Sequence, residues 1–243
     1  MKEIFRIDDN IFYHSKWQDR SASQKFKHSL ILPINTYSPW NGDSDFVSAY
    51  EKAKNNTLLD IYRCYELWDL AKQYSNKDGD ILEVGVWRGG SSLLLASADN
   101  GKGHVFLCDT FSGVVKASDK DSIYKGGEHA DTSEEEVKQL FATAGISNYS
   151  ICKGIFPDES EQNVTSEKFK ICHIDVDVYQ SAKDIFEWVH PKLIKGGAVI
   201  FDDYGFAACE GITTLVHDII SEYQNYIKIY NINGHAILIK TDD

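Results

Sequence analysis

Short apolar runs that alternate with segments of helical spacing constrain the fold of this chain more than any other feature. The apolar runs cover residues 80–85, 104–109, 149–153, 169–176 and 197–201. The helical segments between or after them cover residues 89–98, 134–144, 179–190 and 207–223. Alternating strands and helices build βαβ units, whose strands form a parallel sheet covered by helices. We therefore expect an α/β fold.

Both ends of this region add to the expected architecture. The runs 226–230 and 236–240 are joined by a turn, 231–234, whose Asn and Gly residues favour positive φ. They predict an antiparallel hairpin that finishes the parallel sheet. Between residues 45 and 74, apolar residues at helical spacing predict one or two amphipathic helices. The connection 114–131 has no periodicity and suits either a lid or a disordered loop.

Charge and composition exclude several classes of protein. The net charge of −12 argues against a nucleic-acid partner, because binding to phosphates needs clustered Lys and Arg. The chain has no run of about 18 uncharged apolar residues, so we expect no membrane span. Residues 1–6 carry charges where a signal peptide has an apolar stretch, and the 5 cysteines are scattered like free buried thiols. We therefore expect a cytoplasmic protein.

Glycines and a carboxylate follow the first two apolar runs, where an open α/β sheet binds its ligands. The first run leads into Glu83-Val-Gly-Val-Trp-Arg-Gly-Gly-Ser91, whose glycines let the backbone approach a ligand. Asp109, 24 positions after Gly85, is placed to accept hydrogen bonds from ribose hydroxyls. A plain turn and a capping Asp are the alternatives for each feature alone. Together they predict a nucleoside-containing ligand, and the lack of a strict G-x-G-x-x-G favours S-adenosylmethionine over a dinucleotide.

Four carboxylates follow the fourth and fifth apolar runs. Asp175 and Asp177 share one face of an extended strand end, and Asp202 and Asp203 end the fifth run. If these strands are neighbours, the four groups converge, and no basic residue is close in sequence to neutralise them. A solvated strand end explains either pair alone. Both pairs together predict a divalent cation, and oxygen-only ligands select magnesium, manganese or calcium over zinc.

Such a metal suits methyl transfer to a hydroxyl group. Metal coordination lowers the pKa of an aliphatic hydroxyl, and a neighbouring carboxylate can then take its proton. A metal-dependent glycosyltransferase is the alternative, because Asp175-Val-Asp177 also fits the Asp-x-Asp pattern that holds nucleotide sugars. That interpretation leaves the glycine turn and the Asp202-Asp203 pair without a shared role. A non-catalytic protein that only binds the cofactor is a third hypothesis.

At these residues the chain resembles the macrocin O-methyltransferase (TylF/MycF) family. The resembling segments are 80–92, 105–113, 174–181 and 191–205, within a region from about 56 to 240. Members of the family methylate sugar hydroxyls in antibiotic and glycan biosynthesis with S-adenosylmethionine and magnesium. The resemblance implies a Rossmann-like methyltransferase fold with a mainly parallel, seven-stranded sheet. It also implies a methyltransferase domain over residues 56–243, after an extension over residues 1–55 for acceptor recognition or oligomerisation.

Carried over by position, the resemblance implies a set of site residues. The metal ligands for Mg²⁺, or Mn²⁺ or Ca²⁺, fall on Asp175, Asp202 and Asp203, and the general base falls on Asp177. The implied contacts with S-adenosylmethionine are Thr57, Leu58, Glu83, Val84, Gly85, Val86, Trp87, Asp109, Thr110, Phe111, Gly113, Gly154, Ile155 and Asp175. Val176 departs from the family, in which this position is often glycine. Because a side chain here narrows the site or packs behind it, the acceptor can differ from the macrolide sugars.

The expected partner is a small-molecule or glycan acceptor with a free hydroxyl group. The aromatic residues Phe12, Tyr13 and Trp17 suggest a homo-oligomer, with a plain surface as the alternative. We expect His173 to pack in the core and assign it no role. His235 lies in the hairpin turn, where a substrate could approach, but its spacing supports no assignment.

Overall fold

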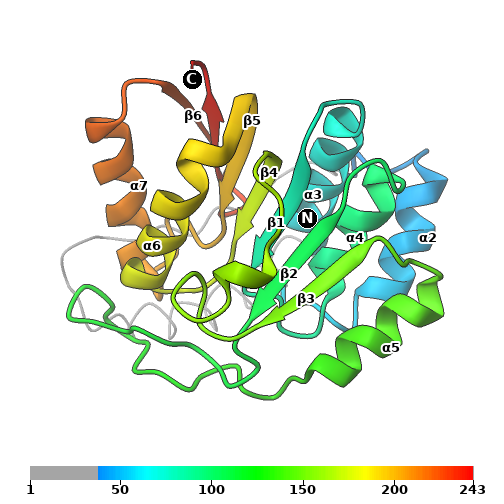
Figure 1. The fold of residues 1–243 in the computed structure, drawn as a ribbon, viewed down its shortest axis with the longest axis horizontal. Coiled ribbons are helices and arrows are strands. Elements are labelled where there is room, and N and C mark those ends of the chain that lie inside the picture. Colours follow the sequence, from blue (N-terminus) through cyan, green and yellow to red (C-terminus); the bar gives the residue numbers. More distant parts are fainter. Residues whose placement is uncertain (1–37, 243) are drawn as a thin grey trace, which may run out of the picture.

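The computed structural model describes residues 38–242 and confirms the Rossmann-like α/β fold (Figure 1). Its strands form a single seven-stranded sheet in the order β3-β2-β1-β4-β5-β7-β6. The strands are β1 (Asp80–Val84), β2 (Val105–Asp109), β3 (Tyr149–Lys153), β4 (Phe169–Ile174), β5 (Leu193–Phe201), β6 (Tyr226–Tyr230) and β7 (Ala236–Lys240). The helices are α2 (Ser44–Ala53), α3 (Ile61–Tyr74), α4 (Gly90–Asp99), α5 (Glu134–Ala144), α6 (Tyr179–Val189) and α7 (Glu210–Glu222), with short 3₁₀ turns η1 (Glu161–Asn163) and η2 (His190–Lys192).

The sheet is parallel from β3 to β5 and antiparallel at its other edge. β1 lies between β2 and β4 and runs parallel to both. β7 pairs antiparallel with β5 and with β6, which confirms the hairpin predicted from the turn 231–234. The chain reverses its direction of winding between β1 and β4. Ligands of open α/β sheets bind at this switch point, beyond the carboxyl ends of the strands.

Helices cover both faces of the sheet, and each face has its own core (Figure 1). Successive strand residues point to opposite faces, so Leu82 packs with α6 and α7 while Ile81 packs with α2, α3 and α4. Both faces of a parallel sheet are buried, which explains why its strands are continuous apolar runs. The cysteines are all buried and free, as expected.

Two elements begin at other residues than the sequence predicts, and one predicted helical segment forms two helices. β5 begins at Leu193 rather than residue 197, because Gly196, with a φ of 74°, and Gly197 interrupt its apolar pattern. α7 begins at Glu210, after a turn that occupies the first residues of the expected helix. The segment 45–74 forms two helices, and Asp60 caps the second by accepting hydrogen bonds from the next turn.

Residues 1–37 lie outside the described part of the chain, and with them most of the expected extension and its aromatic residues Phe12, Tyr13 and Trp17. Within residues 38–242, no helix has the length and apolar character needed to cross a membrane.

Candidate active site

The carboxyl ends of β1, β2, β4 and β5 border a cavity of about 210 Å³. It lies at the switch point of the sheet, where the fold places ligands. The structure brings most of the predicted site residues to this cavity. They are Thr57, Leu58, Val84, Gly85, Val86, Trp87, Asp109, Thr110, Gly113, Gly154, Asp175, Asp177, Asp202 and Asp203.

The turn after β1 depends on a glycine. Gly85 has a φ of 90°, and a Cβ at this position would lie 1.6 Å from the carbonyl oxygen of Asp175. Only glycine therefore lets the turns after β1 and β4 approach this closely. Gly85, Asp175 and Val176, from these two turns, all line the cavity.

Asp109 joins the turns after β1 and β2. Its Oδ2 accepts hydrogen bonds from the backbone N–H groups of Val86 and Trp87, each at 2.8 Å, and its Oδ1 accepts one from Phe111 at 2.7 Å. Burial raises the pKa of Asp109, although these three donors favour the charged form. Oδ1 keeps one lone pair that can accept from a ligand. The carboxylate thus organises the site as well as facing the cavity.

Three predicted cofactor contacts lie beside the cavity and do not line it: Glu83, Phe111 and Ile155. Glu83 points to the opposite face of β1 from Val84 and accepts hydrogen bonds from Ser92 and His173. Phe111 packs against the core on the α2, α3 and α4 face, and the N–H of Ile155 donates to Glu159.

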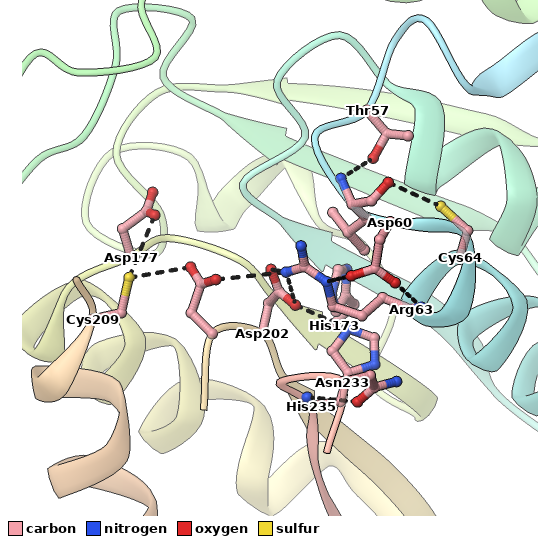
Figure 2. Close-up of polar contacts among 12 residues, drawn as sticks. Thr57, Asp60, Arg63, Cys64, His173, Asp177, Asp202, Cys209, Asn233 and His235 are labelled. Carbon is pink, nitrogen blue, oxygen red and sulfur yellow. Dashed lines mark hydrogen bonds and ion pairs between the residues drawn. The ribbon is translucent and has the colours of Figure 1, made fainter. Parts of the chain in front are cut away.

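The predicted convergence of carboxylates is present. Asp175, Asp202 and Asp203 each place an oxygen within 4.8 Å of the others. Burial and the neighbouring carboxylates raise the pKa of Asp175 and of Asp203 well above the ordinary value. Asp177 does not share a strand face with Asp175, as was expected. Its φ of 66° takes the chain out of strand geometry. It groups with Asp203 and Cys209, whose Sγ lies 3.3 Å from Asp203 and 3.9 Å from Asp177 (Figure 2).

A buried cation that the sequence analysis missed sits against this cluster. Arg63, on α3, donates from Nη1 to both carboxylate oxygens of Asp202, at 2.9 and 2.7 Å (Figure 2). The same atom lies 3.5 Å from Asp203, and Nε donates to Asp60. Burial disfavours its charge, but the carboxylates outweigh this and raise the pKa of Arg63. Among the described residues, no basic residue close in sequence pairs with these carboxylates, as expected, but Arg63, 139 positions before Asp202, pairs with two of them.

His235, just before β7, also contacts Asp202. Its Nε2 lies 3.0 Å from Asp202 Oδ1, and its Nδ1 lies 2.5 Å from Glu66 Oε2. Glu66 further accepts hydrogen bonds from Asn231 and Asn233 in the hairpin turn. Burial disfavours the charged ring, but the contacts with Asp202 and Glu66 raise the pKa of His235 to about 9. Burial opposes ionisation of Asp202 too, yet His235 and Arg63 hold its pKa below the usual range.

The long connection between β2 and α5 borders the cavity and is anchored. Asp121 accepts hydrogen bonds from the backbone N–H of Ser118, in the loop, and of Tyr179, at the start of α6, each at 2.9 Å. From the same loop, Tyr124 and His129 line the cavity, with 3.3 Å between Oη and Nε2. The sequence left a lid and a disordered loop open; the structure shows an ordered loop beside the site.

Comparison with known families places these features in context. Residues 57–238 match the family model of macrocin-O-methyltransferase (TylF). The 8-demethyl-8-(2,3-dimethoxy-alpha-L-rhamnosyl)-tetracenomycin-C 4'-O-methyltransferase of Streptomyces olivaceus is 29% identical over 172 residues, which cover 65% of this chain and 64% of that protein. The mycinamicin III 3''-O-methyltransferase of Micromonospora griseorubida is 30% identical over 146 residues, 54% of this chain and 57% of that protein. The chain thus spans less than two thirds of these relatives.

Solved structures show the same fold. The O-methyltransferase NovP superposes with a TM-score of 0.69 at 23% identity and covers 77% of this chain, which covers 83% of NovP. The calicheamicin methyltransferase CalS11 superposes with a TM-score of 0.64 at 16% identity, over 90% of this chain and 100% of that one. The glycosyltransferase alternative finds no support in these matches.

Proposed function

The chain belongs to the macrocin-O-methyltransferase (TylF) family, and on this premise we propose that it transfers a methyl group from S-adenosylmethionine to a hydroxyl group of a sugar in natural-product or glycan biosynthesis. One observation carries the proposal: the glycine turn, Asp109 and the carboxylates of β4 and β5 all border a single cavity. The names of the two curated relatives, a rhamnosyl-tetracenomycin and a mycinamicin methyltransferase, favour a sugar acceptor.

The half of the cavity beside β1 and β2 suits the cofactor. Backbone at Gly85 and Val86 is open to close approach, and Oδ1 of Asp109 can accept from a ribose hydroxyl. Phe156 and Ile185 line the same cavity and offer apolar surface for a planar base. When bound, S-adenosylmethionine supplies a sulfonium that carries an electrophilic methyl group, so the protein mainly has to position the acceptor oxygen.

Asp177 is the proposed general base. Burial raises its pKa despite the hydrogen bond from Tyr124, and a higher pKa makes a carboxylate a stronger proton acceptor. Tyr124 and His129 line the cavity beside it and would contact the acceptor.

Magnesium fits the donor set of this site. Asp175, Asp202 and Asp203 would hold it, since they offer three oxygens close together and are buried or nearly so. Arg63 already offsets the negative charge of Asp202 and lies near Asp203. Within residues 38–242, Asp175 forms no ion pair, so its charge is left for the metal to offset. When bound, the ion would lower the pKa of the acceptor hydroxyl. The cytoplasmic location stays part of this proposal, because buried free thiols suit a reducing compartment.

Calorimetric titration of S-adenosylmethionine, then of Mg²⁺, into metal-stripped protein tests the proposal. We expect both to bind, the Asp202→Ala variant to lose Mg²⁺ binding while it still binds S-adenosylmethionine, and labelled methyl groups to reach a deoxysugar glycoside from an acceptor panel. Binding of a nucleotide sugar in place of S-adenosylmethionine would overturn methyl transfer. Binding and turnover that are insensitive to a chelator would overturn only the metal.

A further inference from the structure

Two fully buried histidines flank Asp202 (Figure 2). His173 is on β4 and His235 precedes β7, and their ring centroids lie 5.8 Å apart. One ring nitrogen of each histidine and one carboxylate oxygen of Asp202 all lie within 4.8 Å of one another. The proposed methyl transfer uses neither histidine, so their arrangement needs a separate explanation.

Both rings are held in the way that metal-binding histidines are held. Nδ1 of His173 lies 2.8 Å from Glu83 Oε1, and Nδ1 of His235 lies 2.5 Å from Glu66 Oε2. A carboxylate on one ring nitrogen fixes the tautomer and makes the other nitrogen a better ligand. The two outer carboxylates come from different elements, β1 and α3, so both rings are fixed independently.

The second nitrogen of each ring is left without a hydrogen bond. Nε2 of His173 and Nε2 of His235 are buried and accept or donate no hydrogen bond among the described residues. The 3.0 Å contact between His235 Nε2 and Asp202 is an ion-pair distance that lacks hydrogen-bond geometry. Buried polar atoms nearly always have a partner, so the unpartnered Nε2 of His173, beside the His235–Asp202 ion pair, indicates a third group that these residues share.

Charge balance indicates what kind of group is shared. Glu66, Glu83 and Asp202 bring three negative charges, and Arg63 brings one positive charge that it also shares with Asp60 and Asp203. The carboxylates therefore exceed Arg63 by at least two negative charges, of which the protonated His235 ring offsets one. Uncompensated charge is costly inside a protein, and one divalent cation in place of the His235 proton supplies the missing charge.

We propose that His173, Asp202 and His235 form a second cation site, for a divalent transition metal such as Zn²⁺ or Co²⁺. Two imidazoles and one carboxylate are the ligands such ions prefer, in contrast to the oxygen-only group of Asp175, Asp202 and Asp203. Ligand atoms of a tetrahedral ion lie about 3.4 Å apart, so the rings must close slightly on binding. The ion would tie the hairpin turn to the ends of β4 and β5.

Co²⁺ is the probe, because a tetrahedral Co²⁺ ion absorbs visible light far more strongly than an octahedral one. Tag-free, metal-stripped protein should develop this band at a single equivalent, and Zn²⁺, but not excess Mg²⁺, should abolish it. His173→Gln and His235→Gln should each lose the band. Asp203→Asn should keep it, as should His104→Gln, a matched control whose ring pairs with Ser150 away from the site.

A measurement on the wild type covers the case in which a histidine variant does not fold. Ring-nitrogen NMR of the wild type should show the Nε2 signals of two histidines moving together as Zn²⁺ is added. Absence of saturable Co²⁺ binding, or a band and ring shifts that belong to other histidines, would overturn the site and leave a buried water as the shared group. Loss of S-adenosylmethionine or Mg²⁺ binding does not bear on this result, so the two proposals fail separately.

Discussion

Among single residues, Asp177 is the proposed proton acceptor of this site. Replacing it by Asn removes the basic oxygen but keeps the shape, so methyl transfer should fall by about 10²- to 10⁴-fold. Affinity for S-adenosylmethionine should stay at the wild-type value. Single-turnover transfer and calorimetry measure the two quantities, and Asp119→Asn, at an exposed position of the long loop, is the control. Wild-type turnover in Asp177→Asn would remove Asp177 as the base.

Arg63 is the residue on which the buried carboxylates depend for compensation. Removing one partner of a buried ion pair costs about 3–5 kcal/mol, so Arg63→Met should lower the free energy of unfolding by roughly that amount in urea. Mg²⁺ should restore more stability to this variant than to the wild type, because it replaces the lost charge. Arg88→Met, which breaks an exposed pair with Asp131, should cost less than about 1 kcal/mol. Equal losses in the two variants would contradict this role.

The carboxylates could be predicted from the sequence, whereas their partners could not. Asp175 and Asp202 follow recognisable apolar strands, and parallel strands bring their carboxyl ends together. Arg63 lies 139 positions from Asp202, and no local pattern encodes that pairing. The one sequence feature that indicates the pairing is the position of Arg63 on the apolar face of a helix, beside Cys64 and Leu67. A lone polar residue in such a stripe indicates a buried partner but does not identify it.

Among the elements, the loop between β2 and α5 is anchored to a helix by one side chain. α6 has no capping side chain of its own, and Asp121 instead accepts the N–H of Tyr179 at its first turn. Asp121→Ala should therefore cost about 1–2 kcal/mol of stability, as loss of a helix cap does. Limited proteolysis within residues 114–131 should also become faster. Asp119→Ala should change neither quantity, and an unchanged cleavage rate in Asp121→Ala would show that other contacts hold the loop.

Elements were predictable where a period or a turn residue marks them. The hairpin turn was found because Gly234, with a φ of 103°, follows two Asn residues. The first residues of β5 were missed because Gly196 and Gly197 break the apolar pattern. The order of the loop 114–131 was also out of reach. Its anchors are single contacts such as Lys116 with Asp184, and composition does not reveal contacts with distant helices.

At the scale of the whole molecule, the carboxyl ends of the strands border the ligand cavity, whereas the amino ends carry a buried ion pair. The cavity and its carboxylates occupy the carboxyl ends of the strands. At the amino ends, Lys170 on β4 lies 2.6 Å from Asp99, the last residue of α4, and both side chains are fully buried. Asp99 also accepts the backbone N–H of Gly103 before β2. This pair joins a helix to two strands without touching the cavity.

Stability and ligand binding should therefore separate in variants of this pair. Lys170→Met leaves a buried carboxylate at a helix C-terminus, where the helix dipole disfavours negative charge, and should cost about 3–5 kcal/mol. Adding Asp99→Asn should cost less than the sum of the single changes, because the two residues are in contact. Lys168→Met, at an exposed pair with Asp78, should cost less than about 1 kcal/mol. Urea unfolding measures these values, and calorimetry under folded conditions should show wild-type affinity for S-adenosylmethionine. A folded Lys170→Met protein with weakened affinity would show instead that the two ends of the sheet are coupled.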